Sequence, residues 1–164
     1  MGECVQGLVD SQQVRLFVKE HTATTWEEVL NITEIPLPAG ERATDDVTLV
    51  KDLFKRTVAA GVISYPDLEI QGLYVSTGPG QVQRVKLTKY FNEGTCFDWL
   101  ILLPDAEKTS MDGCGTLASL GPVREATKKN RVKLKLTISG EVKERQDGEN
   151  VLDSTDTITL PTTP

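Results

Sequence analysis

The sequence predicts a mainly β protein: a β-sandwich or small barrel with one packed helix and a long interface loop. The clearest observation is the segment 132–140, where Val132, Leu134, Leu136 and Ile138 alternate with polar residues. A period of two over this length indicates a strand with one buried and one solvated face. The rest of the chain adds many short apolar segments bounded by proline and glycine, and a single stretch with helical periodicity. Together these patterns favour short strands with one helix.

The first part of the chain predicts two strands. Residues 14–18 form the first, and residues 26–35 the second. Pro36 and Pro38 end the second strand, because proline cannot donate a hydrogen bond to a neighbouring strand. A helical turn capped by Thr24 is the alternative for the start of this segment, but the prolines that follow favour an extended chain.

The middle of the chain predicts two strands that flank the helix. Residues 68–75 alternate as a strand, in which Gly72 interrupts the phase and indicates a bulge. The turn at 78–80 sets the start of a helix, and Gly94 ends it. Residues 97–103 are nearly all apolar, which is typical of a central strand.

The second half predicts a strand pair. Residues 105–113 read as a polar turn, and the strands at 116–123 and 131–140 are joined by a basic turn at 128–130. The sequence also leaves open a last short strand, formed by Val151 and Ile158 to Leu160. The predicted organisation is one domain, residues 1–143, followed by a polar C-terminal tail, residues 144–164.

Composition limits the classes of function. The chain has 164 residues and a net charge of −6, which disfavours tight phosphate binding because that normally needs a basic face. The longest apolar run, near 99–103, is too short to span a membrane. No basic stretch precedes an apolar run at the N-terminus, so we expect no signal peptide.

The sequence does not predict an enzyme, a metal site or a cofactor. His21 is the only histidine, and it lies in an apparent turn where a solvated position is far more common than a catalytic one. One histidine and scattered cysteines offer no metal-ligand spacing. Gly78-Pro79-Gly80 lacks the lysine of a phosphate-binding loop, so a turn before the helix is the simpler interpretation.

The three cysteines have no paired spacing, which favours assembly in a reducing cytoplasm. Cys96 beside Phe97 is predicted to be a small core residue. Cys114 lies between two glycines and is predicted to be exposed in a loop. Cys4 precedes the first predicted strand.

Residues 38–64 are the least core-like part of the chain and are predicted to form a long loop. Mixed charges are dense there, and a loop of this length in a compact domain is usually functional or disordered. Its apolar residues give it the means to become ordered against a partner. The candidate interface residues are Arg42, Asp45, Asp46, Leu49, Lys51, Leu53, Phe54 and Arg56.

The order of motifs over residues 24 to 142 resembles the major tail tube proteins of long-tailed, non-contractile bacteriophages. An opening tryptophan is followed by a proline-glycine loop, an acidic extended segment, a strand, a helix ending in Gly-Thr, and two further strands. The matching pieces are Trp26, Pro38-Ala-Gly40, Asp46-Val-Thr48, Phe54-Lys-Arg56, Gly61, Leu68-Glu-Ile70, Gln81 to Gly94-Thr95, Phe97, Leu103-Pro-Asp105 and Val132 to Gly140.

The resemblance implies a structural subunit. Such proteins have a β-sandwich flanked by a helix, close into six-membered rings, and stack these rings into a tube. The tube encloses the tape-measure protein, meets the tail terminator and tail-tip proteins, and conducts DNA without binding it specifically. The implied location is the virion tail, assembled in the cytoplasm of the bacterial host, with no membrane contact. In this picture the loop residues above form the ring-stacking interface.

The basic cluster at 128–135 is open to three interpretations. It is a solvated strand face, or a salt-bridging surface toward Asp45 and Asp46 of another subunit, or a nucleic-acid site. The third lacks the interleaved aromatic residues of a stacking platform. We assign Arg131, Lys133 and Lys135 to a strand face that joins subunits, and we expect the lysines to pair with carboxylates of a neighbouring strand or subunit.

Two alternatives of function stay open. One is a tube-forming subunit of a secretion system, to which the same physical arguments about assembly apply. The other is a monomeric β-sandwich module that binds carbohydrate or protein. Sugar-binding modules expose aromatic platforms, whereas Trp26 and Trp99 fall in predicted strands here.

Overall fold

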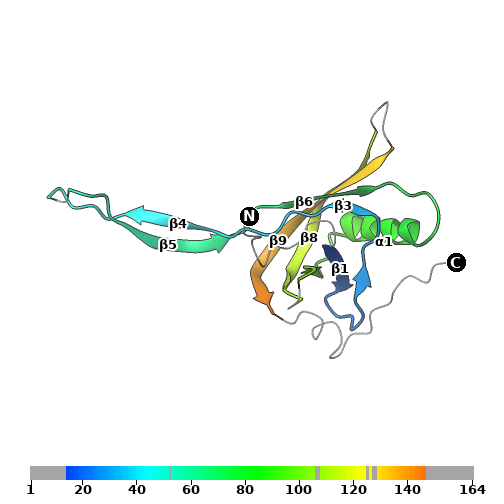
Figure 1. Ribbon diagram of the computed structural model, residues 1–164, viewed down its shortest axis with the longest axis horizontal. Coiled ribbons are helices and arrows are strands. Elements are labelled where there is room, and N and C mark those ends of the chain that lie inside the picture. The colour runs from blue at the N-terminus through cyan, green and yellow to red at the C-terminus, as the bar shows by residue number, and fades with distance from the viewer. Residues whose placement is uncertain (1–13, 52, 106–107, 125, 127–128, 147–164) are drawn as a thin grey trace, which may run out of the picture.

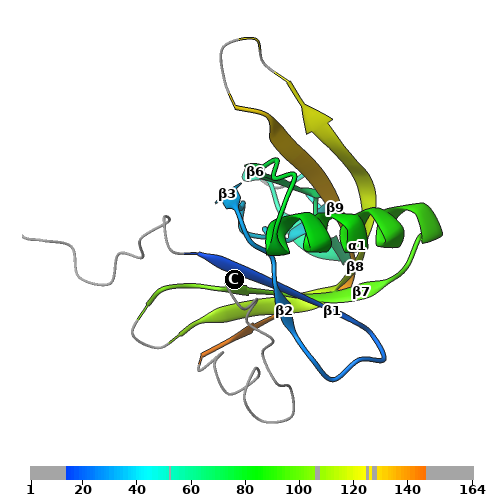
Figure 2. The ribbon, with the colours of Figure 1, turned by 90° about the vertical axis from the view of Figure 1, so that its right-hand side faces the viewer.

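The computed structural model describes residues 14–51, 53–105, 108–124, 126 and 129–146. A seven-stranded antiparallel sheet forms the body, in the order β2-β1-β7-β8-β9-β6-β3. Its strands are β1 (Arg15–Glu20), β2 (Glu27–Glu28), β3 (Ile32–Glu34), β6 (Leu68–Leu73), β7 (Phe97–Leu102), β8 (Ser110–Val123) and β9 (Arg131–Arg145). The sheet curls into half a barrel around the helix α1 (Pro79–Glu93), as Figure 2 shows. The mainly β prediction with one packed helix is therefore confirmed.

The core lies between the concave face of the sheet and α1. Leu134 and Leu136 of β9 are buried there beside Ile70 of β6, and α1 contributes Leu87 and Tyr90. Val132 and Ile138, on the same face of β9, are only partly buried. The observed burial along β9 thus follows the alternation from which this strand is predicted. A second cluster of buried residues comprises Phe17, Trp26, Leu100 and Leu102.

Glycines define both ends of α1. Gly78 precedes the helix with a φ of 80°, and Pro79 occupies the first turn. Gly94 adopts the left-handed conformation, and its N–H donates to the carbonyl oxygen of Phe91 at 3.3 Å. The predicted helix boundaries are confirmed, because glycine takes positive φ without a steric cost.

Short polar contacts hold α1 against the chain between β1 and β3. The Lys86 ammonium lies 2.5 Å from a carboxylate oxygen of Glu27. The Gln83 amide accepts a hydrogen bond from the Leu30 N–H at 2.9 Å and donates to the Glu28 carbonyl. The single strand predicted for 26–35 is split into β2 and β3. Gln83 of α1 forms hydrogen bonds with β2 and with the connection between these two strands.

Gly72 is needed for a close backbone approach. A Cβ at this position would lie 2.8 Å from the Asn31 carbonyl oxygen, which is closer than real contacts allow. Gly72 pairs with Ile32, and the irregular register lies beside it in β3, between Ile32 and Glu34. The sequence signal therefore marks the place of the irregularity, although the shift belongs to the partner strand.

Two predicted loops are strands. Residues 38–64 contain β4 (Glu41–Asp46) and β5 (Thr57–Ser64), which form a two-stranded antiparallel hairpin. Gly61 lies inside β5 with a φ of 73°, where the register with β4 shifts. The predicted turn at 105–113 is shorter than expected, because β8 begins at Ser110 and pairs with β7 over residues 110–115.

The hairpin of β4 and β5 projects from the body as a long arm (Figure 1). We call residues 41–64 the arm, and residues 47–56 between its strands the arm tip. β9 runs to Arg145, so its last two residues belong to the predicted tail, of which 147–164 lie outside the described residues.

Candidate assembly surfaces

The arm brings together all of the predicted ring-stacking residues. Arg42, Asp45 and Asp46 lie in β4, and Arg56 directly precedes β5. Leu49, Lys51, Leu53 and Phe54 lie in the arm tip, and each of the eight residues is exposed. The side chains of Leu53 and Phe54 are 93% and 82% exposed, far beyond what is usual for residues of their size.

Sequence reasoning missed part of the apolar surface of the arm. Val50 in the tip is fully exposed, and Val58, Val62 and Ile63 of β5 are exposed as well. The sequence does not reveal that β5 pairs only with β4. Because neither face of this hairpin packs on the body, its apolar residues lie in solvent. Apart from partly buried Ala60, every residue of β4 and β5 is exposed.

A hydrogen-bonded turn orders the arm tip. The Asp46 carboxylate accepts hydrogen bonds from the Thr48 N–H at 2.9 Å and from the Thr48 hydroxyl at 2.5 Å. The Arg56 N–H donates to the Thr48 hydroxyl oxygen at 2.8 Å across the arm. The Thr48 hydroxyl, followed by its backbone N–H, holds the pKa of Asp46 below its ordinary value. The Lys55 ammonium, at 3.8 Å, adds a weaker contact.

The sheet has two long unpaired strand edges in the described part of the chain. β9 pairs with β8 over most of its length but with β6 only over residues 131–136, so one side of 137–145 has no partner strand. β8 pairs with β7 only over 110–115, so one side of 116–123 has none. The two edges lie on opposite sides of the β8–β9 pair, since β7 flanks one side and β6 the other.

The predicted subunit-joining residues lie on the face of β9 opposite to the core. Lys133 is exposed, while Arg131 and Lys135 are partly buried. The Lys135 ammonium lies 3.4 Å from a carboxylate oxygen of Asp67, just before the neighbouring strand β6. This is an intramolecular partner of the kind predicted for these lysines. Lys128 of the basic cluster lies outside the described residues.

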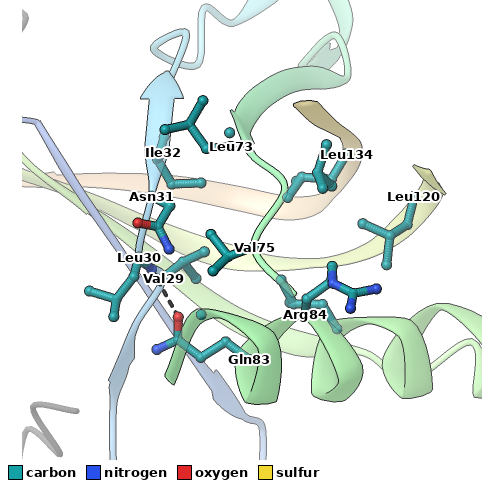
Figure 3. Close-up of a pocket in the computed structure, with 14 residues that line it drawn as sticks. Val29, Leu30, Asn31, Ile32, Leu73, Val75, Gln83, Arg84, Leu120 and Leu134 are labelled. Atoms are coloured by element: carbon teal, nitrogen blue, oxygen red, sulfur yellow. Dashed lines mark hydrogen bonds between the residues drawn. The ribbon is translucent and has the colours of Figure 1, made fainter. Parts of the chain in front are cut away.

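An apolar pocket lies between α1 and the sheet (Figure 3). Its volume is about 40 Å³, and Val75, Leu87, Leu120 and Leu134 are among the side chains that line it. Arg84 borders it, with its guanidinium 4.4 Å from the centre of the Tyr74 ring. The buried Nε of Arg84 has no hydrogen-bond partner among the described residues.

The face of α1 that points away from the pocket also carries apolar side chains. Val82 and Val85 are 68% and 57% exposed, on the same helix that contributes Gln83, Arg84 and Leu87 to the pocket. Leu87 and Tyr90 are the buried residues of this helix, whereas Val82, Val85 and Phe91 are exposed.

The cysteine predictions are wrong in two respects. Cys96 is exposed and lies just before β7, which begins at Phe97. Cys114 lies in strand β8 and is partly buried, and its thiol donates to the Ser139 carbonyl at 3.0 Å. Burial, followed by the nearby Cys96 and Asp98 side chains, raises the pKa of the Cys114 thiol. Cys4 lies outside the described residues.

His21 lies in an exposed turn, as predicted, with its Nδ1 2.9 Å from a carboxylate oxygen of Asp98. Among the described residues, no group of three or more His, Cys, Asp or Glu side chains is arranged to hold a metal ion. The described part of the chain also contains no helix that is long and apolar enough to cross a membrane.

No family model matches the sequence, and no curated protein matches it. Solved structures do match the fold. A chain of the tail of an empty gene transfer agent particle, computed with C6 symmetry, has a TM-score of 0.66 at 14% identity. The match covers 83% of this chain and 98% of that one.

Two further structures give the same result. A chain of the six-fold symmetrised baseplate of the anti-feeding prophage has a TM-score of 0.69 at 8% identity, covering 87% of this chain and 99% of that chain. A chain of the SPP1 tail tube has a TM-score of 0.61 at 11% identity, covering 89% and 86%. This chain therefore has the fold of these phage-type tail, tail tube and baseplate chains, which confirms the fold predicted from the motif order.

Proposed function

We propose that this chain is a structural subunit of a phage-type tail tube, which joins copies of itself into six-membered rings that stack into a conduit for DNA. The observation that carries the proposal is the combination of a tail tube fold with two unpaired strand edges and an exposed arm. A monomer would leave all three surfaces bare, and unpaired edges are usually protected or paired.

The two edges support joining within a ring. Residues 137–145 of β9 in one copy and residues 116–123 of β8 in the next offer unsatisfied backbone groups on opposite sides of the sheet. Pairing one with the other is a heterologous contact, which closes into a ring when the rotation per subunit divides a full turn. The C6 and six-fold symmetries of the similar structures support six subunits per ring.

The net charge supports a conduit rather than a DNA-binding protein. With a net charge of −6, the subunit lacks the excess of cations that gives phosphate contacts their affinity. We propose the tape-measure protein, the tail terminator and the tail-tip proteins as further partners, the virion tail as the location, assembly in the host cytoplasm, and no enzymatic activity. These follow from the motif resemblance and the shared fold.

The burial of the tryptophans argues against the carbohydrate-binding alternative. Trp26 and Trp99 are 4% and 0% exposed, so neither provides an aromatic platform. A tube-forming subunit of a secretion system would also need to pair its strand edges with those of other copies, and the genes next to this one would distinguish it from a phage tail.

Light scattering coupled to size-exclusion chromatography tests the proposal. We expect a species of about six times the 18.0 kDa chain mass, and larger multiples at higher concentration. The measurement is repeated with the proposed tape-measure and tail-tip partners added, in case assembly needs a nucleus. A folded monomer under all of these conditions overturns the proposal.

A further inference from the structure

We propose that Cys96 and Cys114 are a thiol pair that closes into a disulfide bond when the chain meets an oxidising medium. The bond joins the connection that follows α1 to strand β8. It forms within one chain, so it does not depend on the proposed assembly.

The pairing of β7 with β8 brings the two cysteines close together. Cys114 lies directly opposite Asp98 in the register, and Cys96 is two residues before Asp98. Diagonal neighbours across an antiparallel pair of strands are about 7–8 Å apart at their Cα atoms and closer at their Cβ atoms. The Cys96 side chain is within hydrogen-bonding reach of the Cys114 thiol. The two sulfur atoms therefore lie on the same side of the sheet.

The backbone at Cys96 can supply the remaining movement. A disulfide bond usually needs Cα atoms about 4.4–6.8 Å apart. Phe97 and Gly115 form the first pair at this end of β7 and β8, so Cys96 lies just outside the described sheet. It is exposed, and it follows the glycine that ends α1 by two residues. A small shift of this connection, rather than of either strand, brings the two sulfur atoms into bonding distance.

The two thiols differ in access, which sets the order of the reaction. Cys96 is exposed, whereas Cys114 is partly buried and its thiol donates to the Ser139 carbonyl at 3.0 Å. Burial, followed by the nearby Cys96 and Asp98 side chains, raises the pKa of the Cys114 thiol. Because the thiolate is the form that attacks a disulfide, Cys96 reacts first and Cys114 second.

The oxidant is a low-molecular-weight disulfide such as oxidised glutathione. The Cys96 thiolate attacks one of its sulfur atoms, which forms a mixed disulfide and releases one glutathione thiolate. The Cys114 thiol loses its proton to solvent, attacks the Cys96 sulfur and displaces the second glutathione. Two protein thiols are thereby oxidised to one disulfide, and one oxidised glutathione is reduced to two thiols. The pair stays open in a reducing cytosol and closes outside it.

The bond fastens the sheet at the point where the edge of β8 becomes free. Beyond Gly115, residues 116–123 have no partner strand on the β7 side in the described part of the chain. The disulfide closes the loop from Cys96 to Cys114, which restricts the unfolded chain and so stabilises the folded one. We expect oxidation to raise the melting temperature of the subunit by roughly 5 °C or more.

Peptide mapping of the full chain after treatment with oxidised glutathione tests the pair. Trypsin releases Cys96 and Cys114 on separate peptides, residues 90–108 and 109–124. With free thiols blocked by N-ethylmaleimide, we expect these peptides to be linked in chains that run as monomers on a non-reducing gel, and to separate after dithiothreitol. Linkage to Cys4 or to another copy instead, or two unlinked thiols, overturns the inference and leaves the proposed function intact.

Matched serine variants test the bond and the order of attack, in chains that also carry Cys4→Ser so that two thiols remain. The Cys4→Ser chain should melt at a higher temperature after oxidation and return to its first value with dithiothreitol. Adding Cys96→Ser should abolish the rise, and a rise that persists overturns the bond. Adding Cys114→Ser should leave a lasting mixed disulfide at Cys96, formed about tenfold or more faster than the one at Cys114 in the Cys96→Ser chain. Equal rates overturn the assigned order.

Discussion

Asp46 and Thr48 form a two-pronged contact at the base of the arm tip, in which one carboxylate oxygen accepts from both the N–H and the hydroxyl of the threonine. The same hydroxyl oxygen accepts from the Arg56 N–H on the other side of the arm. This turn sets the path of the chain into Leu49 and Leu53. The order of the exposed tip thus depends on hydrogen bonds, among them those of the Asp46 carboxylate and of the Val47 N–H with the Arg56 carbonyl, rather than on a core.

Asp46→Asn is expected to weaken assembly more than Asp45→Asn does. Both changes remove one negative charge from the exposed strand β4, but only Asp46 holds Thr48. The circular dichroism spectrum and the thermal melting of the body should be unchanged in both variants, because neither residue contacts the core. Light scattering of the assembled species measures the difference, and equal effects of the two variants would show that charge alone matters here.

The same contact predicts a pH dependence. Its hydrogen bonds lower the pKa of Asp46 in the folded arm relative to the unfolded chain. The order that it contributes is therefore complete above the unfolded value, about 3.9, and is lost as the pH falls through the lower folded value. A carboxyl-carbon NMR titration should show the pKa of Asp46 rising in Thr48→Ala. An unchanged pKa in that variant contradicts the assigned cause.

Truncating the core side chains of β9 is expected to destabilise the subunit strongly. Leu134→Ala or Leu136→Ala should cost ~2–5 kcal/mol in the free energy of unfolding, because each leaves a cavity under α1 and β6. Lys133→Ala, on the exposed face of the same strand, is the control and should cost far less. Urea unfolding of the three variants measures these values, and a cost below about 1 kcal/mol for the leucines would place β9 outside the core.

Substitutions of Lys133 and Lys135 in β9 are expected to separate effects on folding from effects on the joining of subunits. Lys135→Gln breaks the partly exposed contact with Asp67 and should cost at most about 1 kcal/mol of stability. Lys133→Glu reverses a charge on the exposed face that we assign to subunit joining, so it should impair assembly and leave melting unchanged. Replacing both lysines by glutamate should likewise affect joining more than folding. Normal tubes from the double variant would show that these lysines are merely solvated.

The end of β9 gives a sharp truncation test of the C-terminal tail. Ending the chain after Gln146 should change stability by no more than about 1 kcal/mol. Ending it after Gly140 should cost more, because it removes Val142, which packs against the core, and the pairing of Lys143 to Arg145 with β8. Denaturant melts compare the two. A large loss from the shorter truncation would mean that residues 147–164 stabilise the body.

Much of the body could be predicted from the sequence, because local signals and burial agree there. The alternation of β9, the apolar run of β7 and the glycines that bracket α1 each specify an element on their own.

The arm and the start of β8 could not be predicted in the same way. β4 has the sequence ERATDD, which shows no apolar alternation, and it is a strand only because β5 pairs with it. The first residues of β8 are rich in glycine and polar residues, and their conformation follows from pairing with β7. The pocket at α1 was also missed, since its lining comes from segments far apart in the chain.

Electron microscopy of negatively stained, concentrated protein tests the central claim most directly. The account predicts hollow tubes, or stacked rings with six-fold symmetry in end views, formed by the protein alone or with the proposed tape-measure and tail-tip partners. Uniform single subunits that are folded by circular dichroism, in the presence of those partners, would contradict it.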